Sequence, residues 1–96
     1  MSDTALPNWT DFAGKDGCLC TVAVGEDRHA FTLEQAENLG GTLRPGGSFR
    51  LVFRGPVDPL LPQGTYRVMA EGFDVQMFLV PIARDARGSQ YEAIFN

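Results

Sequence analysis

A chain of 96 residues, 44% hydrophobic and 21% charged, is long enough for one compact domain with a single core, and nothing in its composition indicates disorder along its length. The net charge of −4 and the scattered arginines argue against a nucleic-acid-binding surface. No apolar run reaches the ~18 residues of a membrane-spanning helix, and no signal peptide is recognisable. We therefore expect a cytoplasmic protein that makes no membrane contact.

The N-terminal region begins with small and polar residues over 1–7, which are expected to be flexible. Residues 8–14 show the spacing of a short helix, because Trp9, Phe12 and Ala13 share one apolar face. We expect Trp9 to cover an open end of the β core. The alternative is an exposed aromatic anchor for a protein partner, so Trp9 is a candidate interaction residue.

Residues 18–24 form a nearly continuous apolar run that is typical of a strand. Within it, Cys18 and Cys20 face the same side, at a separation along the strand that is unfavourable for a disulfide. Two buried, unreactive thiols are the expected state, with a redox or metal role as the alternative. The chain has no further cysteine that could complete a zinc site.

The segment 29–39 fits two different structures. With a period of two residues, Phe31 and Leu33 lie on one face of a strand. With a spacing of three residues, Leu33, Ala36 and Leu39 share one face of a short helix that begins with a capping-box sequence. We favour the strand, because the turn before this segment invites a hairpin.

Two segments rich in glycine or proline are expected to be connections between strands. Residues 40–47 contain four glycines and predict a mobile loop, but not a phosphate-binding one, because the glycine pairs lead into a strand and not into a helix. Residues 55–63 contain three prolines and predict an ordered arch with Leu60 or Leu61 in the core.

The C-terminal half shows the alternation of apolar and polar residues that predicts strands over 49–54, 66–70, 73–80 and 90–95. The first of these strands should direct three large side chains inward: Phe49, Leu51 and Phe53. A tight turn at Glu71–Gly72 joins the second strand to the third.

The third strand of this half also has apolar residues on its second face, Phe78 and Val80. It is therefore expected to be covered on both sides at the centre of the sheet, with Pro81 marking its end or edge. With the two upstream segments, the pattern predicts a single all-β domain over 1–96: about six antiparallel strands in a small barrel or sandwich, preceded by a short helix.

Candidate catalytic and metal-binding residues are few. His29, the single histidine, follows an acidic turn and has no partner that the sequence identifies, so a solvated hairpin residue is expected. A three-ligand metal site of His29 with Cys18 and Cys20 is conceivable across strands, but nothing requires it. We predict no catalytic residue, no cofactor and no metal.

Arginines are the charged residues with a distinctive arrangement. Arg50 and Arg54 flank Val52 on one face of a strand, and Arg67 is expected on a neighbouring strand. Such a face could present guanidinium groups to a carboxylate-bearing partner, so all three are candidate interaction residues. The simpler interpretation is that their stems cover the outer face of the sheet. If Glu92 pairs with one of them across strands, that pair has a structural role.

Four motifs resemble those of a small bacterial domain family of unknown function: F-x-L-x-F-R-G-P from Phe49, L-P-Q-G-x-Y from Leu61, F-L-V-P-I from Phe78 and Y-E-A-x-F-N from Tyr91. Genes of this family stand near those of phage-tail-collar-type proteins. The resemblance implies an accessory or assembly role, and it supplies no catalytic residues.

These observations favour a non-enzymatic domain that acts through a protein partner or through self-association, without nucleic acid or membrane. The alternative is a small-molecule ligand-binding barrel whose mouth lies under the 40–47 loop. An enzyme is the third hypothesis.

Overall fold

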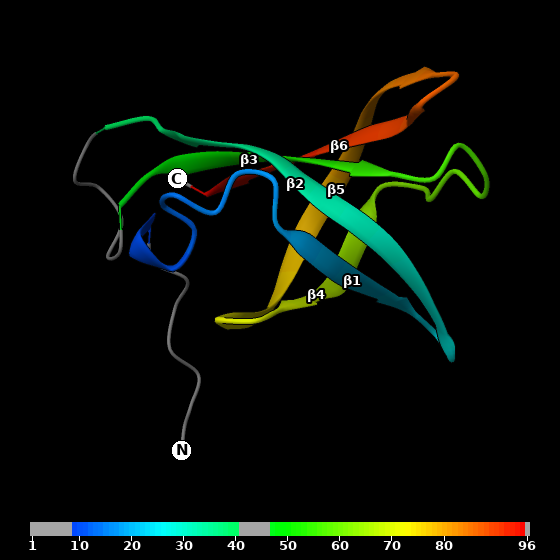
Figure 1. The fold of residues 1–96 in the computed structure, drawn as a ribbon, viewed down its shortest axis with the longest axis horizontal. Helices are drawn as coiled ribbons and strands as arrows, with labels where there is room; N and C mark the ends of the chain where they lie inside the picture. The colour runs from blue at the N-terminus through cyan, green and yellow to red at the C-terminus, as the bar shows by residue number, and fades with distance from the viewer. Residues whose placement is uncertain (1–8, 41–46, 96) are drawn as a thin grey trace.

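The computed structural model describes residues 9–40 and 47–95, which form six strands and one short helical turn (Figure 1). The strands are β1 (Leu19–Val24), β2 (Asp27–Asn38), β3 (Phe49–Gly55), β4 (Gly64–Ala70), β5 (Phe73–Asp85) and β6 (Gly88–Phe95). They close into an antiparallel barrel in the order β1-β2-β3-β6-β5-β4. The predicted all-β fold is confirmed, and the barrel is the form that it takes.

Some sequence predictions fall outside this description. Those for residues 1–7 and for most of the 40–47 loop concern parts of the chain that the structure does not describe. Within the described ranges, no helix has the length and apolar character that crossing a bilayer requires.

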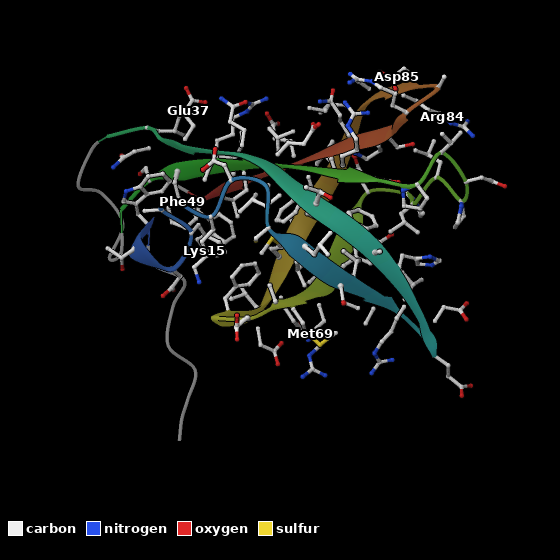
Figure 2. The ribbon with its side chains drawn as sticks, in the orientation of Figure 1. Lys15, Glu37, Phe49, Met69, Arg84 and Asp85 are labelled. Carbon is white, nitrogen blue, oxygen red and sulfur yellow. The ribbon has the colours of Figure 1, made fainter. Side chains whose placement is uncertain are left out.

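The inner face of β3 contributes three large side chains to the hydrophobic core of the barrel. Phe49, Leu51 and Phe53 are fully buried, as their alternation with polar residues predicts. Each fully buried side chain of this size contributes roughly 1.5–3 kcal/mol to the free energy of folding. Further core residues come from the other strands and from the connections: Phe12, Cys20, Val22, Phe31, Leu33, Leu61, Val68, Phe73, Met77, Leu79, Tyr91 and Ala93. The interior is thus filled by side chains (Figure 2).

One end of the barrel is closed by the segment before β1. A single 3-10 turn, η1 (Trp9–Asp11), carries the chain back so that Phe12 enters the core, with its ring centroid 4.8 Å from that of Phe73 and 5.3 Å from that of Phe49. Trp9 is half-buried and packs 6.1 Å from Phe49. Trp9 therefore covers this end only in part, and Phe12 is the plug.

β2 settles the ambiguity of segment 29–39 in favour of the strand. Its register with β3 shifts between Leu33 and Gln35, where Glu34 is an extra residue. The bulge changes which residues point inward, because the core-facing positions pass from the buried Phe31 and Leu33 to the partly buried Ala36. Because the bulge adds one residue to the strand, the core-facing residues Leu33 and Ala36 are three positions apart. This is the spacing that also suggested a helix.

β5 is longer and less covered than its sequence suggests. It continues through Pro81 to Asp85, with a second register shift between Pro81 and Ala83. Proline lacks a donor, so it is tolerated at such an irregularity and need not end the strand. Phe78 is 51% exposed, so the prediction of cover on both faces is wrong. A closed barrel has one inner face and no central strand.

The connections largely follow the predicted chemistry. Glu71 and Gly72 form the two-residue turn between β4 and β5, where Gly72 has a φ of +104°. In the arch before β4, Leu61 is the buried leucine and Leu60 is exposed. The Leu61 amide donates to the Tyr91 hydroxyl at 2.9 Å, which fixes the arch to β6.

Candidate functional site

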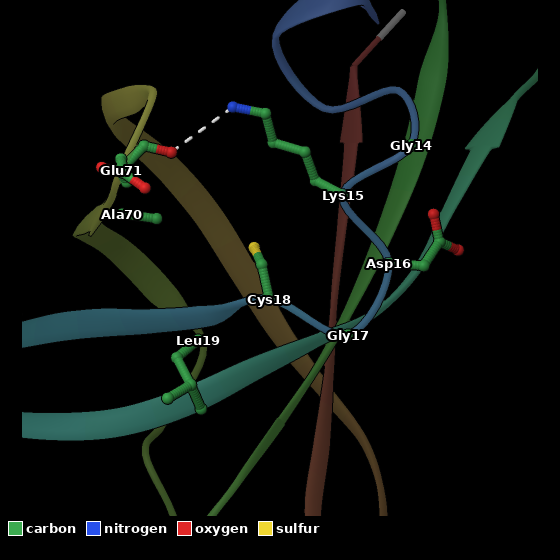
Figure 3. A pocket seen from close by; sticks show the side chains of 8 residues that line it. All are labelled: Gly14, Lys15, Asp16, Gly17, Cys18, Leu19, Ala70 and Glu71. Atoms are coloured by element: carbon green, nitrogen blue, oxygen red, sulfur yellow. Dashed lines mark hydrogen bonds between the residues drawn. The ribbon is translucent and has the colours of Figure 1, made fainter.

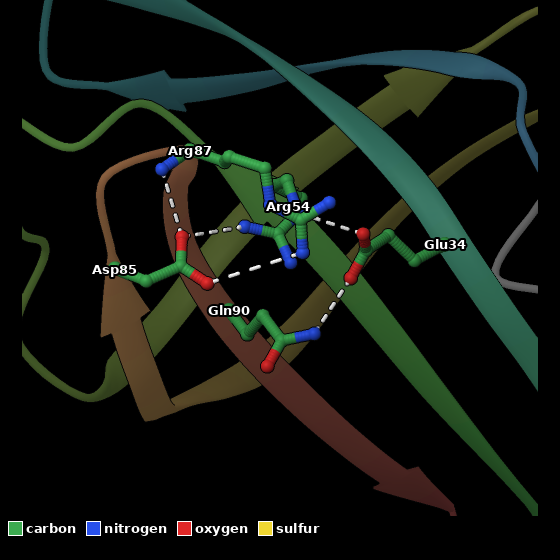
Figure 4. A network of polar contacts seen from close by, with 5 residues as sticks. All are labelled: Glu34, Arg54, Asp85, Arg87 and Gln90. Atoms are coloured by element: carbon green, nitrogen blue, oxygen red, sulfur yellow. Dashed lines mark hydrogen bonds and ion pairs between the residues drawn. The ribbon is translucent and has the colours of Figure 1, made fainter.

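Arg54 on β3 is the centre of a polar cluster on the outer face of the barrel (Figure 4). Its Nε donates to Glu34 Oε2 at 2.7 Å, and its Nη1 lies 3.3 Å from Asp85 Oδ1. The other Glu34 oxygen accepts from Gln90 Nε2 at 2.7 Å. This cluster ties β2, β3 and β6 to the end of β5.

Glu34 reaches this cluster because it is the extra residue of the β2 bulge. The hydrogen bond from Arg54, followed by that from Gln90, lowers the pKa of the Glu34 carboxyl. The backbone N–H of Arg87 and the charge of Arg54 likewise lower the pKa of Asp85. Glu34 was not a candidate from the sequence, because the bulge that brings it to Arg54 depends on how β2 pairs with β3.

We expect Glu34→Gln to lower stability near neutral pH and to have less effect in acid. A carboxyl whose folded pKa is depressed stabilises the protein above its unfolded pKa, and this contribution is lost as the pH falls through the folded value. Urea unfolding of both proteins from about pH 7 to about pH 3 measures the effect. A difference between them that does not change with pH would contradict this account. Glu26→Gln, in the exposed β1–β2 turn, is the matched control.

Arg50 forms the second ion pair of the β3 outer face. Its Nε bonds to Glu92 on β6, and its Nη1 lies 3.7 Å from Glu37 Oε1 on β2. Between the two arginines, Val52 is only 5% exposed although it alternates with the inward residues, as expected where long side-chain stems cover an apolar residue. Glu92 thus pairs with Arg50 across the β3–β6 ladder. A partner's carboxylate at Arg50 would have to displace an internal one.

Arg67 is not on the outer face that Arg50 and Arg54 share, and the prediction that its strand neighbours β3 is wrong. It is on β4, whose neighbours are β1 and β5, because β3 pairs with β2 and β6 in the closed barrel. Arg67 makes a bidentate contact with Asp74, in which Nε donates to Oδ1 at 2.9 Å and Nη2 donates to Oδ2 at 2.6 Å. These hydrogen bonds lower the pKa of Asp74. Both side chains are about half exposed, so the pair contributes little to stability.

The second candidate site is an open surface pocket of about 640 Å³, shown in Figure 3. The β1–β4 ladder extends only from Thr21, opposite Met69, to Ala23, opposite Arg67. Beyond Thr21 the two strands diverge, and the pocket occupies the gap. The residues that line it are Gly14, Lys15, Asp16, Gly17, Cys18, Leu19, Ala70 and Glu71.

Lys15 bridges this pocket. Its Nζ donates to the backbone carbonyl of Glu71 at 3.4 Å and lies 5.8 Å from the centre of the Phe73 ring (Figure 3). The lysine therefore holds the segment before β1 against the β4–β5 turn, with its cationic end at the rim of the pocket.

The two cysteines differ in their surroundings. Cys20 is 3% exposed in the core, whereas Cys18 precedes β1, lines the pocket and is half-buried, so the predicted burial holds for Cys20 alone. Both are free thiols with their sulfurs 3.9 Å apart. Burial, followed by the neighbouring Cys18, raises the pKa of Cys20 to about 12.

His29 does not join the cysteines in a metal site. It lies opposite Val22 in the β1–β2 ladder, while Cys20 lies opposite Phe31. Among the residues that the structure describes, no three or more His, Cys, Asp or Glu side chains are grouped to hold a metal ion.

Apolar side chains also gather on the outside of the barrel. Val80 on β5 lies opposite Glu92 on β6, and this pair is the last of the β5–β6 ladder at that end. Phe78, two residues before Val80, and Ile94, two residues after Glu92, are 51% and 49% exposed. We call Phe78, Val80 and Ile94 the β5–β6 apolar patch. It is bordered by Thr65 opposite Phe78 and by Arg50 opposite Ile94. The sequence analysis missed this patch, because it placed Phe78 and Val80 under cover.

Comparison with known proteins gives one match. A family model described as "Domain of unknown function (DUF6916)" matches residues 7–95. No curated protein and no solved structure matches the chain. The match agrees with the resemblance to an uncharacterised domain family, and it covers both halves of the chain. The chain is a member of the DUF6916 family of domains of unknown function.

Proposed function

We propose that this domain is a non-enzymatic protein-interaction module that docks another protein chain through the β5–β6 apolar patch. The observation that carries the proposal is the exposure of Phe78 on β5 and of Ile94 on β6, two strands that pair as far as Val80 opposite Glu92. A large aromatic and a branched aliphatic side chain, each about half exposed on the outside of neighbouring strands, can supply the apolar centre of an interface.

The surroundings of the patch support the same function. Arg50 lies opposite Ile94, and its ion pairs with Glu92 and Glu37 form a charged border to the apolar centre. An apolar core with a polar rim is the usual plan of a protein interface, and arginine is enriched there. The barrel is closed, so a partner would bind this outer face through side chains and would not add a strand to a free sheet edge.

The broader setting that we propose is an accessory role in a phage-tail-like or collar-associated assembly in bacteria. Its support is the resemblance of the four C-terminal motifs described above. The proposal includes a cytoplasmic location, where the two free thiols would stay reduced.

Light scattering after gel filtration tests the proposal. The purified domain is measured over a range of concentrations, alone and after incubation with extract of the native host, and co-eluting chains are identified. We expect a defined complex, either with one specific companion or with a second copy of the domain.

Two variants connect that complex to the patch. Phe78→Ser should abolish it, while Leu19→Ser should leave it intact, since Leu19 is 75% exposed on β1, with β4 between β1 and β5. A complex that survives in Phe78→Ser would overturn the proposed docking surface. A domain that stays monomeric and without companions at every concentration would overturn the interaction function.

The second candidate function is small-ligand binding, and one observation favours it. The pocket between β1 and the β4–β5 turn is large enough for a small molecule. The barrel interior is filled by core side chains, so a ligand would bind at this surface site and not inside the barrel. A ligand that binds the native state would raise the melting temperature in a thermal-shift screen, and Lys15→Met should reduce the rise.

A further inference from the structure

We infer that Cys18, which lines the pocket beside β1, and the buried Cys20 next to it form a two-thiolate site for a soft monovalent metal ion such as Cu⁺. The two sulfurs are on the same side of the chain and 3.9 Å apart. Their hydrogen-bonding contacts are weak ones, with each other and from Cys20 to the Cys18 carbonyl. Cys18 lines the pocket, which gives an ion a way in from solvent (Figure 3).

The separation of the sulfurs suits one shared ion. An ion with two ligands holds them on opposite sides, so two sulfurs that each lie ~2.3 Å from it would be up to about 4.6 Å apart. The thiols are 3.9 Å apart, so they would have to separate by less than about 1 Å to take one ion between them. A disulfide would instead need the sulfurs to approach to about 2.05 Å.

The number of ligands selects the kind of ion. Thiolates are soft ligands that prefer Cu⁺ and zinc among the biological metals. A structural zinc site takes about four protein ligands, whereas the described residues offer no cluster of three or more His, Cys, Asp or Glu side chains. Cu⁺ forms stable complexes with only two thiolate ligands, so the pair of cysteines favours Cu⁺ over zinc.

Charge supports the same assignment. Binding one Cu⁺ replaces two thiol protons, so the bound centre carries a net charge of −1. Lys15 lines the same pocket and holds its ammonium group at the rim by its bond to the Glu71 carbonyl (Figure 3). A cation at this place compensates the charge of the dithiolate centre.

Titration of the reduced, full-length chain with Cu⁺ under anaerobic conditions tests the inference, with the Cu⁺ chelator bathocuproine disulfonate as competitor. We expect one Cu⁺ per chain to be retained against the chelator, and Cys18 to be protected from iodoacetamide. Cys18→Ser should weaken binding by about 100-fold or more, and Lys15→Met by about tenfold, as for a group outside the ligand set. Leu19→Ala alters the pocket wall without removing a sulfur and should bind normally.

Cys18→Ser is the decisive variant, because Cys18 is half-buried and its replacement should leave the core intact. Cys20→Ala is compared after circular dichroism has shown that it folds, and it should lose binding equally. Transfer of all Cu⁺ from the wild type to the chelator would overturn the inference. So would full retention of Cu⁺ by Cys18→Ser, or binding of Zn²⁺ as tightly as Cu⁺.

Discussion

Replacing Phe12 with alanine is expected to destabilise the domain by about 3–5 kcal/mol, the range for removing a fully buried aromatic ring. Phe12 is completely buried although it belongs to no strand, and its ring packs against those of Phe49, Phe73 and Phe95. These three rings come from β3, β5 and β6, so the cavity would open where three strands meet at the end of the barrel.

Urea unfolding gives the size of the effect, and thermal unfolding should show a fall of about 12 °C or more in the melting temperature. Phe78→Ala is the matched control, because the same ring is removed from a side chain that is 51% exposed. It should change stability by less than about 1 kcal/mol. If Phe12→Ala costs no more than Phe78→Ala, Phe12 does not act as the plug of the core.

The strands of the C-terminal half were predictable because their determinants are local. In β3 the inward residues alternate strictly with polar or smaller ones, and at Glu71–Gly72 the glycine supplies the positive φ that a two-residue turn needs. Period-two alternation and turn chemistry act over a few residues, so they can be read from the sequence without knowledge of the partner strands.

The two bulges were harder to predict because they change the period within a strand. Glu34 in β2 shifts which residues face inward and produces a helix-like spacing. In β5 the proline at position 81 suggested a strand end, but the strand continues past the register shift that follows it. A bulge depends on how a strand pairs with its neighbour, and the sequence of one strand does not contain that information.

Closure of the barrel decided which parts of the candidate site come together. The Arg50–Glu92 pair could be anticipated, since β3 and β6 are both clear strands that can pair. Arg67 could not be placed, because its separation from β3 depends on the pairing of β4 with β1 and β5. The pocket at Cys18 also arises from this pairing, since it opens where the short β1–β4 ladder ends.

The order of strands also explains why the two proposed sites can act separately. The β5–β6 apolar patch lies on the outer faces of β5 and β6, whereas the pocket opens at the β1–β4 seam and the β4–β5 turn. Variants at Phe78 and at Cys18 therefore test different regions of the barrel. A loss of protein docking with intact Cu⁺ binding, or the reverse, would show that the two activities are independent.

The second large effect is expected for Gly55→Ala, which should cost about 1–3 kcal/mol through overpacking. Gly55 is buried at the end of β3, and a Cβ atom there would lie 2.5 Å from Cζ of Phe31. The Phe31 ring has little room to move, because it is 1% exposed and packs 5.2 Å from the ring of Tyr91. The added methyl group must therefore displace core atoms or the strand itself.

Two comparisons establish the cause. Gly64→Ala on β4 is the matched control, since its new Cβ would meet only ordinary contacts of 3.8 Å or more with Tyr66, and it should be neutral or stabilising by about 0.4–1 kcal/mol. In a Phe31→Leu background the Gly55→Ala change should cost less, with a coupling free energy of at least about 0.5 kcal/mol in urea unfolding. Equal costs of Gly55→Ala in both backgrounds would show that the Phe31 ring is not what excludes a side chain at position 55.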